Sequence, residues 1–265
     1  AVRRLLRIAE AADRKNLKIA AGLMCRHSKN RQELMKRIHD GQLGDIHLIR
    51  AYRMEPVGPL DRKPPEEKEL FWQIRNFFRF LWVSGGLFAE MDIHQIDEIC
   101  WLKDGWPVSA HGVGGRAVNN TDTSQNLDSF SIEWTFADGA KFFMEGRLIT
   151  GCHNEFASYA HGSKGSAIIS YSGHSPAKSK LFKSQNMKNK DDIIWKWKDK
   201  KEPNPYQLEW DHLMAAIREN KPYNEAKRGA EASLVTAMGR LASHTGRVIT
   251  YDQALNHDHE FAPDV

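Results

Sequence analysis

The sequence predicts an α+β fold in which helices cover one face of a largely antiparallel, open sheet. Alternating apolar and polar side chains recur in short segments between residues 108 and 171, with turn signals between them. Segments with helical periodicity flank this region, at 84–98 before it and at 206–217 after it. A block of strands between blocks of helices is typical of a sheet that buries one face under helices.

The first 24 residues combine a helical pattern with a short apolar run. Basic residues separate the apolar positions of the helical pattern, and Lys18–Met24 follows as an expected buried strand. A helix that leads into a buried strand is typical of a parallel α/β unit. The apolar positions of this helix are Val2, Leu5, Leu6, Ile8, Ala9 and Ala12.

The next segments predict one more helix and the first strand of the sheet. Residues 30–39 have amphipathic spacing, and Ile46–Tyr52 alternates as a strand does. We expect Arg50 or Tyr52 to point from this strand into a cleft. Four prolines within 54–68 indicate a surface loop.

The predicted sheet continues through alternating segments, and Asp138-Gly139 between two of them has the sequence of a hairpin turn. Large apolar residues occupy both alternations of 129–136 and 140–149, so we expect the sheet face without helices to form an oligomer contact. Lys178–Lys201 is rich in lysine, and we interpret it as a solvated, mobile insertion, with a basic binding loop as the alternative. The alternating segments are 108–114, 129–136, 140–149, 155–161 and 167–171.

The C-terminal part is predicted to be helical again. Residues 206–217 have helical spacing and end before Pro222, and 226–244 is rich in alanine. The chain is then expected to leave the second helix through Gly246 into a short strand that ends near Tyr251.

Composition indicates a globular protein that binds neither nucleic acid nor membrane. The formal charge is +4, from 38 basic and 34 acidic residues, which is too mild to indicate a nucleic-acid partner. Hydrophobic residues make up 41% of the chain, but no run approaches the length of a membrane span. The three cysteines are far apart and odd in number, so we expect reduced thiols and a cytoplasmic protein.

The residues with the clearest chemical pattern lie between Ser84 and Glu98. Glu90, His94 and Asp97 are spaced i, i+4 and i+7, which places them on one helix face. A carboxylate one turn from a histidine can fix its tautomer and raise its basicity, as general acid/base catalysis requires. The same spacing also fits a solvated face or a structural pair. A metal site is a further alternative that neither an HExxH pattern nor a Cys/His pair supports.

Charged residues in the predicted sheet offer a second set of candidates. Arg116 and Arg147 are unusual in strands and could bind a sugar hydroxyl or a carboxylate, although surface ion pairs explain them equally well. His153 could line the same cleft. Arg116, Arg147 and His153 are therefore predicted to bind substrate.

The run Ser84-Gly85-Gly86, followed by Glu90 and then His94-Gln-Ile-Asp97, resembles the GGGxxxDxxxHxxD helix of the Gfo/Idh/MocA family of oxidoreductases. The chain departs from that pattern in having Ser84 for the first glycine and Glu90 for the aspartate. The resemblance implies that this helix carries catalytic His94, Glu90 and Asp97. It also implies that Arg75 and Asn76, just before the glycines, lie near the cofactor, which is NAD or NADP.

The resemblance implies that the chain consists of two parts. Residues 1–24 resemble the last helix and strand of the family's Rossmann domain, and 25–265 resemble its α/β substrate-binding and oligomerisation domain. Cys25-Arg26-His27 resembles the family's arginine-containing turn, so Arg26 is expected to bind substrate. The glycine-rich run Gly112–Arg116 comes nearest to GxGxxG, but no helical pattern follows it.

The function implied by the resemblance is hydride transfer between NAD(P) and a sugar, an inositol or a related polyol, in a homo-oligomer. One alternative is a glycosidase-like or eliminase-like enzyme that oxidises its sugar transiently with bound NAD. Another is a noncatalytic sugar-binding or oligomerisation module, since the chain has no recognisable phosphate-binding loop.

Overall fold

The computed structural model describes residues 1–57, 60, 62–117, 123–198 and 201–258, which form a nine-stranded mixed sheet and the helices that pack on it. In chain order the strands are β1 (Ile46–Met54), β2 (Ser109–Gly115), β3 (Ser129–Thr135), β4 (Lys141–Arg147), β5 (Glu155–Gly162), β6 (Gly165–Tyr171), β7 (Lys180–Phe182), β8 (Ile193–Lys196) and β9 (Ile249–Thr250).

The strands are ordered β8-β7-β6-β5-β1-β4-β3-β2-β9. Each neighbouring pair is antiparallel except β1 and β4, which run parallel, so the expectation of a largely antiparallel open sheet is confirmed. The predicted hairpin turn joins β3 to β4. Gly139 has a φ of +86° there, and its N–H donates to the carbonyl of Phe136 at 2.9 Å.

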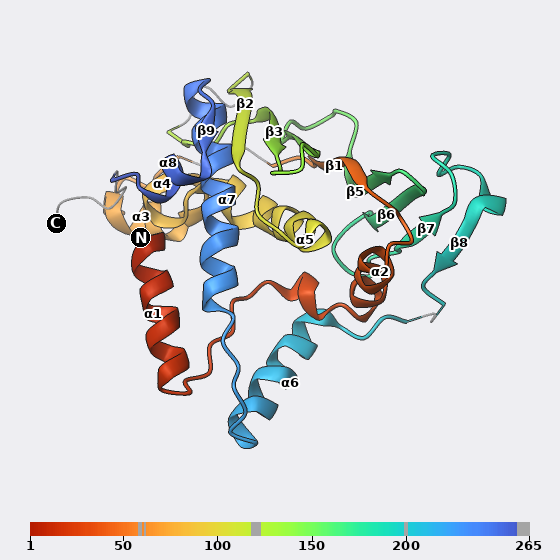
Figure 1. Ribbon diagram of the computed structural model, residues 1–265. Helices are drawn as coiled ribbons and strands as arrows, with labels where there is room; N and C mark the ends of the chain where they lie inside the picture. The colour runs from red at the N-terminus through yellow and green to blue at the C-terminus, as the bar shows by residue number, and fades with distance from the viewer. Residues whose placement is uncertain (58–59, 61, 118–122, 199–200, 259–265) are drawn as a thin grey trace.

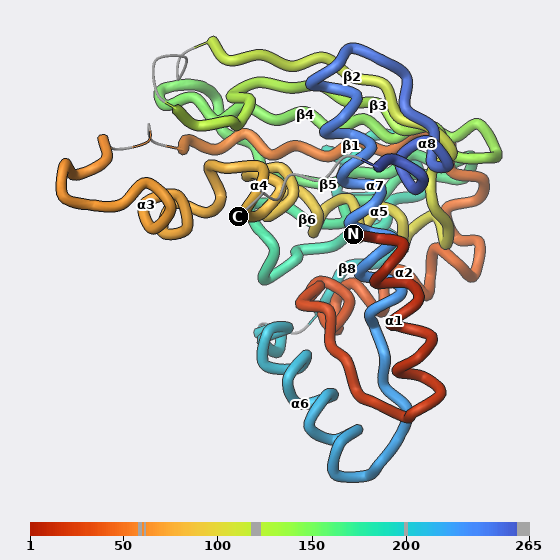
Figure 2. Tube along the Cα trace, turned by 90° about the vertical axis from the view of Figure 1, so that its left-hand side faces the viewer, coloured from red at the N-terminus to blue at the C-terminus, as the bar shows by residue number. Residues whose placement is uncertain are grey.

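Helices α5 (Ile93–Lys103), α7 (Ala226–Thr245) and α2 (Lys29–His39) lie on one face of this sheet, and α8 (Tyr251–Leu255) lies near its β9 edge (Figure 1). Figure 2 shows two projections from this body, one carrying α3 (Glu69–Arg75) and α4 (Leu81–Ser84), the other carrying α1 (Val2–Arg14) and α6 (Pro205–Arg218). Shorter helical turns are η1 (Met24–His27), η2 (Phe77–Arg79), η3 (Phe88–Asp92) and η4 (Lys190–Asp192). None of the helices in the described part combines the length and the apolar character that a membrane crossing requires.

The core lies between the sheet and these helices. Trp134 and Phe142 are fully buried and stack at 4.8 Å between ring centroids. The indole of Trp134 donates to the carbonyl of Val235 in α7 at 3.1 Å, which ties the helix to the sheet. Gly239 lets α7 approach this closely, because a Cβ there would lie 2.2 Å from the indole ring.

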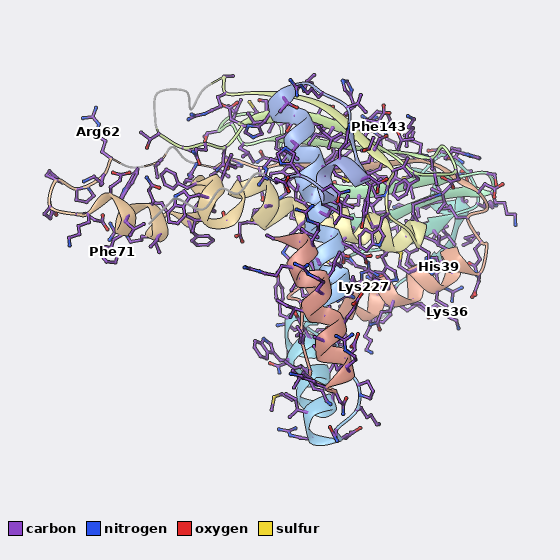
Figure 3. All side chains as sticks on the ribbon, turned by 60° about the vertical axis from the view of Figure 1, so that its left-hand side comes forward. Lys36, His39, Arg62, Phe71, Phe143 and Lys227 are labelled. Carbon is purple, nitrogen blue, oxygen red and sulfur yellow. The ribbon has the colours of Figure 1, made fainter. Side chains whose placement is uncertain are left out.

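The other face of the sheet is less apolar than the sequence analysis expected. The large side chains of β3 alternate toward the helices, where Ile132 and Trp134 are buried. Outward positions of β3 and β4 include Glu133 and Glu145, with Phe143 as the aromatic exception (Figure 3). The expectation of apolar side chains on both alternations is therefore wrong for β3, because its apolar residues all share one face.

Two further expectations need correction. Lys18–Met24 is not a strand, because Gly22 has a φ of +66° and Ile19 makes only a single parallel bridge, to Asn224. Lys178–Lys201 is not a solvated insertion in its described part, since it forms β7 and β8 at the edge of the sheet. Leu181 and Phe182 anchor it in the core, where both are buried.

Candidate functional site

The candidate site is built around the start of α5. Gly85 and Gly86 end α4 with φ values of +82° and +80°, which favour glycine. The chain then passes through η3, a π-helical turn, before α5 begins at Ile93. The helix expected from Ser84 onward is therefore interrupted, and Glu90 lies in the π-helical part while His94 lies in the α-helical part.

Buried polar contacts fix α5 in position. Gln95 is fully buried, and its amide N–H groups donate to the carbonyls of Tyr52 and Ala157, each at 3.2 Å. Glu98 forms a fully buried ion pair with Arg31 of α2. These contacts hold the helix against both the sheet and its neighbouring helix, so the rotation of His94 about the helix axis is fixed.

Asp97 is also held by a cation. Arg26 of η1 donates to both carboxylate oxygens of Asp97 at 2.8 Å, and its guanidinium lies over the ring of Trp101 at 5.0 Å. Asp97 is 1% exposed, so this is a buried, bidentate ion pair. The structure brings the predicted residues Asp97 and Arg26 together, but as partners of each other, with both carboxylate oxygens engaged by the guanidinium.

His94 lies against His174, with 5.0 Å between ring centroids. Nε2 of His174 is 3.2 Å from Nη1 of Arg53, and its Nδ1 is 3.7 Å from the thiol of Cys25. Because a guanidinium can only donate, Nε2 of His174 accepts and its proton is on Nδ1. Burial is the largest cause that lowers the pKa of His174 to about 2, and the cations Arg53 and Arg31 act in the same direction, so this imidazole is neutral.

His94 is neutral for the same reasons. Burial, the positive charge of Arg53 and, to a smaller degree, that of Arg31 lower its pKa to about 4, although Asp97 acts in the opposite direction. Nδ1 of His94 is shielded from solvent and has no hydrogen-bond partner among the described residues. Nε2 is not among the buried side-chain atoms that lack a partner, which leaves it as the ring nitrogen available to a small molecule.

Glu90 has the opposite electrostatic shift. Burial raises its pKa, and no neighbouring charge in the described part of the chain lowers it. The expected contact between Glu90 and His94 is not among the hydrogen bonds and ion pairs of the described residues. The pKa of His94 is lowered and the pKa of Glu90 is raised, so at neutral pH His94 is the group suited to act as a base and Glu90 the group suited to act as an acid.

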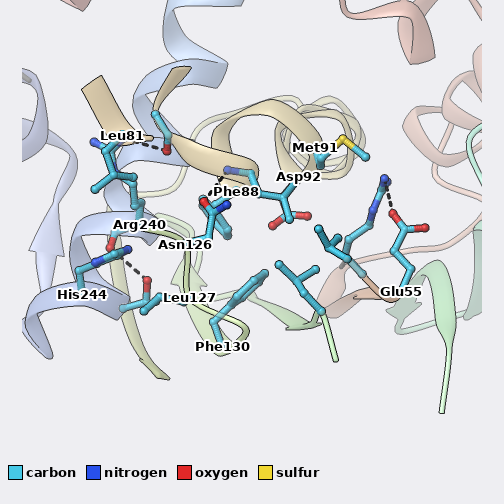
Figure 4. A pocket seen from close by; sticks show the side chains of 16 residues that line it. Glu55, Leu81, Phe88, Met91, Asp92, Asn126, Leu127, Phe130, Arg240 and His244 are labelled. Atoms are coloured by element: carbon cyan, nitrogen blue, oxygen red, sulfur yellow. Dashed lines mark hydrogen bonds and ion pairs between the residues drawn. The ribbon is translucent and has the colours of Figure 1, made fainter. Parts of the chain in front are cut away.

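Arg53 connects this site to an adjacent cavity. Its guanidinium stacks on Phe156 at 4.1 Å and pairs with Glu55 at 2.6 Å. Asp92 is buried beside it, and burial raises the pKa of that carboxyl to about 8 even though Arg53 opposes the shift. Figure 4 shows Asp92 reaching into the cavity from the helix side, and Phe130 lines it from the sheet.

Arg147 and His153 are not part of this arrangement. Arg147 is in register with Met54 across β1 and β4, one residue after Arg53, so its side chain leaves the opposite face of the sheet. Its Nη2 donates to the carbonyl of His153 at 2.6 Å. Arg116 directly follows β2, whose last residue pairs with Ser129 beside Arg147. These three predicted residues lie toward one end of the sheet, and in the described part of the chain no hydrogen bond or ion pair joins Arg147 or His153 to His94.

Arg75 and Asn76 lie at the end of α3, in the projection whose tip carries Phe71 in Figure 3. Arg75 is exposed and pairs with Glu67. The side-chain amide of Asn76 donates to the carbonyl of Trp72 at 2.9 Å, closing the last turn of the helix. In the described chain these two residues are engaged locally, and neither contacts the His94 cluster.

Arg53, His174 and Asp92 were not predicted from the sequence. For Arg53 a signal was present, because it shares a strand face with the buried residues Ile49 and Ala51. Arg50 and Tyr52, which were expected to face a cleft, lie on the opposite, open face. His174 follows a strand in an irregular segment, where periodicity carries no information.

Comparison with known proteins agrees with this architecture. The model of the GFO/IDH/MocA C-terminal domain matches residues 31–168. No curated protein sequence matches the chain.

Solved structures share the fold at low sequence identity. Scyllo-inositol dehydrogenase from Lactobacillus casei, with bound NAD(H) and scyllo-inositol, is 20% identical with a TM-score of 0.64, over 95% of this chain and 70% of that one. Aldose-aldose oxidoreductase from Caulobacter crescentus is 17% identical with a TM-score of 0.69, over 94% and 68%. Myo-inositol 2-dehydrogenase from Lactobacillus plantarum is 18% identical with a TM-score of 0.61, over 89% and 65%.

Proposed function

Because this chain belongs to the GFO/IDH/MocA family by its C-terminal domain, we propose that it is the substrate-binding part of an NAD(P)-dependent oxidoreductase that acts on a sugar, an inositol or a related polyol. The names of similar structures support this class of substrate, since they include two inositol dehydrogenases and an aldose oxidoreductase. Residues 25–265 would form this part, and residues 1–24 would be the end of a Rossmann domain.

The described residues do not fit the phosphates of the cofactor. The one glycine-rich run that comes near a dinucleotide fingerprint, Gly112–Gly115, is extended within β2 and does not open a helix. Backbone N–H groups at a helix N-terminus are what holds a pyrophosphate in such folds. We therefore assign only the substrate end of the reaction to these residues.

The observation that carries the proposal is a neutral His94 with an accessible Nε2 beside a buried cation. Oxidation of an alcohol requires that the hydroxyl proton leave as hydride leaves the same carbon. Nε2 of His94 would accept that proton, and the guanidinium of Arg53 would favour the developing alkoxide. Protonation of His94 is unfavourable because of burial and the charge of Arg53, which favours onward transfer of the proton, and Glu90 is the group that we propose would accept it when substrate or water bridges the two side chains.

The test is steady-state turnover of the native protein with NAD or NADP and a panel of polyols. His94→Ala should lower kcat by about 10²–10⁴, the usual contribution of a positioned acid/base. Glu90→Gln should lower it less. His111→Ala, at an exposed position of β2, is the matched control and should be without effect. Normal kcat in His94→Ala, at an unchanged thermal midpoint, would make the catalytic interpretation wrong.

A second candidate rests on the raised pKa of Glu90. Burial raises the pKa of Glu90, so this carboxyl keeps its proton to higher pH than an exposed glutamate does, and a protonated carboxyl can protonate a leaving group, as a glycosidase or an eliminase requires. Such an enzyme would oxidise the sugar only transiently, so turnover would proceed without net NADH formation. Accumulation of NADH in proportion to product would exclude this candidate.

We also propose that the open face of the sheet joins two or more copies of the chain. Among the described residues no helix covers this face, and Val113 on it is 62% exposed. Phe143 projects from the same face in Figure 3. The mixture of aromatic and charged side chains there suits an interface that is partly polar.

A further inference from the structure

Three side chains with metal-binding atoms converge beneath the sheet, at the junction of η1, α6 and α7. His27 ends η1, Glu209 lies on α6, and Glu225 precedes the first residue of α7. The ligand atoms of these three residues lie within 4.8 Å of one another. Segments separated by about 200 residues thus contribute to one polar cluster.

His27 provides the second observation that points to a ligand. It is 5% exposed, and its Nε2 has no hydrogen-bond partner among the described residues although it faces the cluster. Nε2 lies 3.4 Å from Oε1 of Glu225. This distance is longer than that of a normal hydrogen bond, so Nε2 is only weakly compensated in its buried position, and a ligand there would give it a stronger contact.

The other ring nitrogen of His27 indicates what that partner is. Nδ1 of His27 is 2.9 Å from Nδ1 of His212 on α6. Two lone pairs cannot face each other at this distance, so one nitrogen donates to the other. When His27 donates, its Nε2 carries a lone pair directed at two carboxylates. Metal-ligating histidines are held in this way, with one nitrogen in a hydrogen bond and the other toward the ion.

The charges of the cluster favour a cation. Glu209 is 8% exposed, and burial raises its pKa, although the nearby His27 opposes that shift. Glu225 already has partners on both oxygens, since Arg228 donates to Oε1 at 2.6 Å and the N–H of Ala21 donates to Oε2 at 3.1 Å. The N–H of Gly22 and the charge of Arg228 also lower the pKa of Glu209, but burial has the larger effect, so a cation at this carboxylate would still be favourable.

The distances suit a small divalent ion. Bonds of about 2.0–2.2 Å from zinc to nitrogen and oxygen place neighbouring tetrahedral ligands about 3.3 Å apart. The separation of 3.4 Å between His27 and Glu225 is already at this value. The ligand atoms lie within 4.8 Å of one another, so Glu209 would need to close by at most about 1.5 Å, a movement that a side chain of its length allows by rotation.

We propose that His27, Glu209 and Glu225 bind a divalent transition metal, for which zinc is the best-suited ion, and that His212 positions His27. Imidazole favours zinc over magnesium or calcium, and three protein ligands leave a fourth position for water. Such an ion would fix η1 to α6 and α7. This inference is independent of the proposed reaction at His94.

The test is zinc retention by the protein after dialysis, measured by elemental analysis, together with calorimetric titration. One zinc ion per chain is expected, and zinc should raise the thermal midpoint. Glu209→Gln should weaken zinc binding at least tenfold, and His212→Ala should weaken it by about 10–100-fold, as loss of a hydrogen bond to a ligand does. Glu219→Gln, an exposed position at the end of the same helix, is the matched control and should bind zinc normally.

Two results would overturn the proposal. One is a wild-type protein that retains no zinc in stoichiometric amount. The other is zinc binding of equal strength in Glu209→Gln and in the wild type, which would indicate adsorption at exposed histidines. Circular dichroism of each variant shows whether it is folded. The wild-type stoichiometry and its zinc-dependent thermal midpoint decide the question without any variant.

Discussion

The ion pair between Asp97 and Arg26 allows a structural role to be separated from a substrate-binding role. Asp97→Asn keeps the shape of the side chain but removes its charge, and it leaves the guanidinium of Arg26, whose side chain is 15% exposed, without a counterion. Removing one partner of a buried ion pair costs about 3–5 kcal/mol. Because asparagine retains one acceptor for the two 2.8 Å hydrogen bonds, we expect the lower end of that range, about 3 kcal/mol.

The assay is thermal and urea unfolding of Asp97→Asn, of Arg26→Met and of the double variant. For a chain of this size, about 3 kcal/mol corresponds to a fall of about 6–12 °C in the thermal midpoint. The double variant should be less destabilised than the sum of the single variants, because neither charge is then left alone. If Asp97→Asn unfolds within about 0.5 kcal/mol of wild type, the ion pair does not hold α5, and the substrate-binding interpretation of Asp97 gains support.

Further predictions concern Asp92, Gly239 and the assembly of the chain. Burial raises the pKa of Asp92 to about 8, so the folded protein loses stability as pH rises from about 4 to about 8. Asp92→Asn does not ionise, so in urea unfolding it should gain stability relative to wild type toward high pH. An equal gain at all pH values would contradict this. Gly239→Ala should destabilise by about 1–3 kcal/mol because its Cβ meets Trp134 at 2.2 Å, whereas Gly105→Ala, with no contact closer than 3.8 Å, should change the thermal midpoint little. Light scattering should report a dimer or a tetramer, and a monomer at all concentrations would count against the open sheet face as an interface. Calorimetry on the 265-residue chain should show weak or no binding of NAD and NADP, and micromolar binding would refute our assignment of the phosphate site outside these residues.

The strands were predictable because their side-chain alternation reflects a sheet with one buried face. In β3 the buried residues Phe130, Ile132 and Trp134 recur at every second position, which is the physical requirement for packing against helices. The same requirement explains why the lysine-rich segment 178–201 was wrongly predicted to be a solvated insertion. Its lysine side chains can reach solvent from a strand, and the two buried residues Leu181 and Phe182 are enough to hold that strand at the edge of the sheet.

The candidate site was less predictable, because its residues depend on two features that local periodicity does not reveal. Glu90 lies within the π-helical turn of η3 and His94 lies after it in α5, so an i, i+4 spacing in sequence does not produce the side-chain contact expected of a continuous α-helix. Arg53 and His174 reach His94 from a strand and from an irregular segment far along the chain. Such contacts depend on sheet order, which a single sequence does not specify.

Asp92 could have been identified from helix geometry. It precedes Ile96 by four residues and Ile99 by seven, which places it on the stripe that faces the core. Its neighbours Met91 and Ile93 are only half-buried, so the core stripe passes through Asp92 although it is the polar residue of the three. A carboxyl on a core stripe is costly unless its pKa rises, and that rise is what the structure shows.

The short helix η1 explains how the site at His94 and the proposed metal site come to be neighbours. It is a 3₁₀ helix, with about three residues per turn, so consecutive side chains leave it about 120° apart. Cys25 contacts His174, Arg26 pairs with Asp97 of α5, and His27 turns to His212 and Glu225. A strand here would alternate between two directions only and could not reach all three partners. An ion that fixes His27 would therefore also fix the direction in which Arg26 leaves η1. Because Arg26 is paired with Asp97, the ion would in turn help to hold α5, the helix that carries His94.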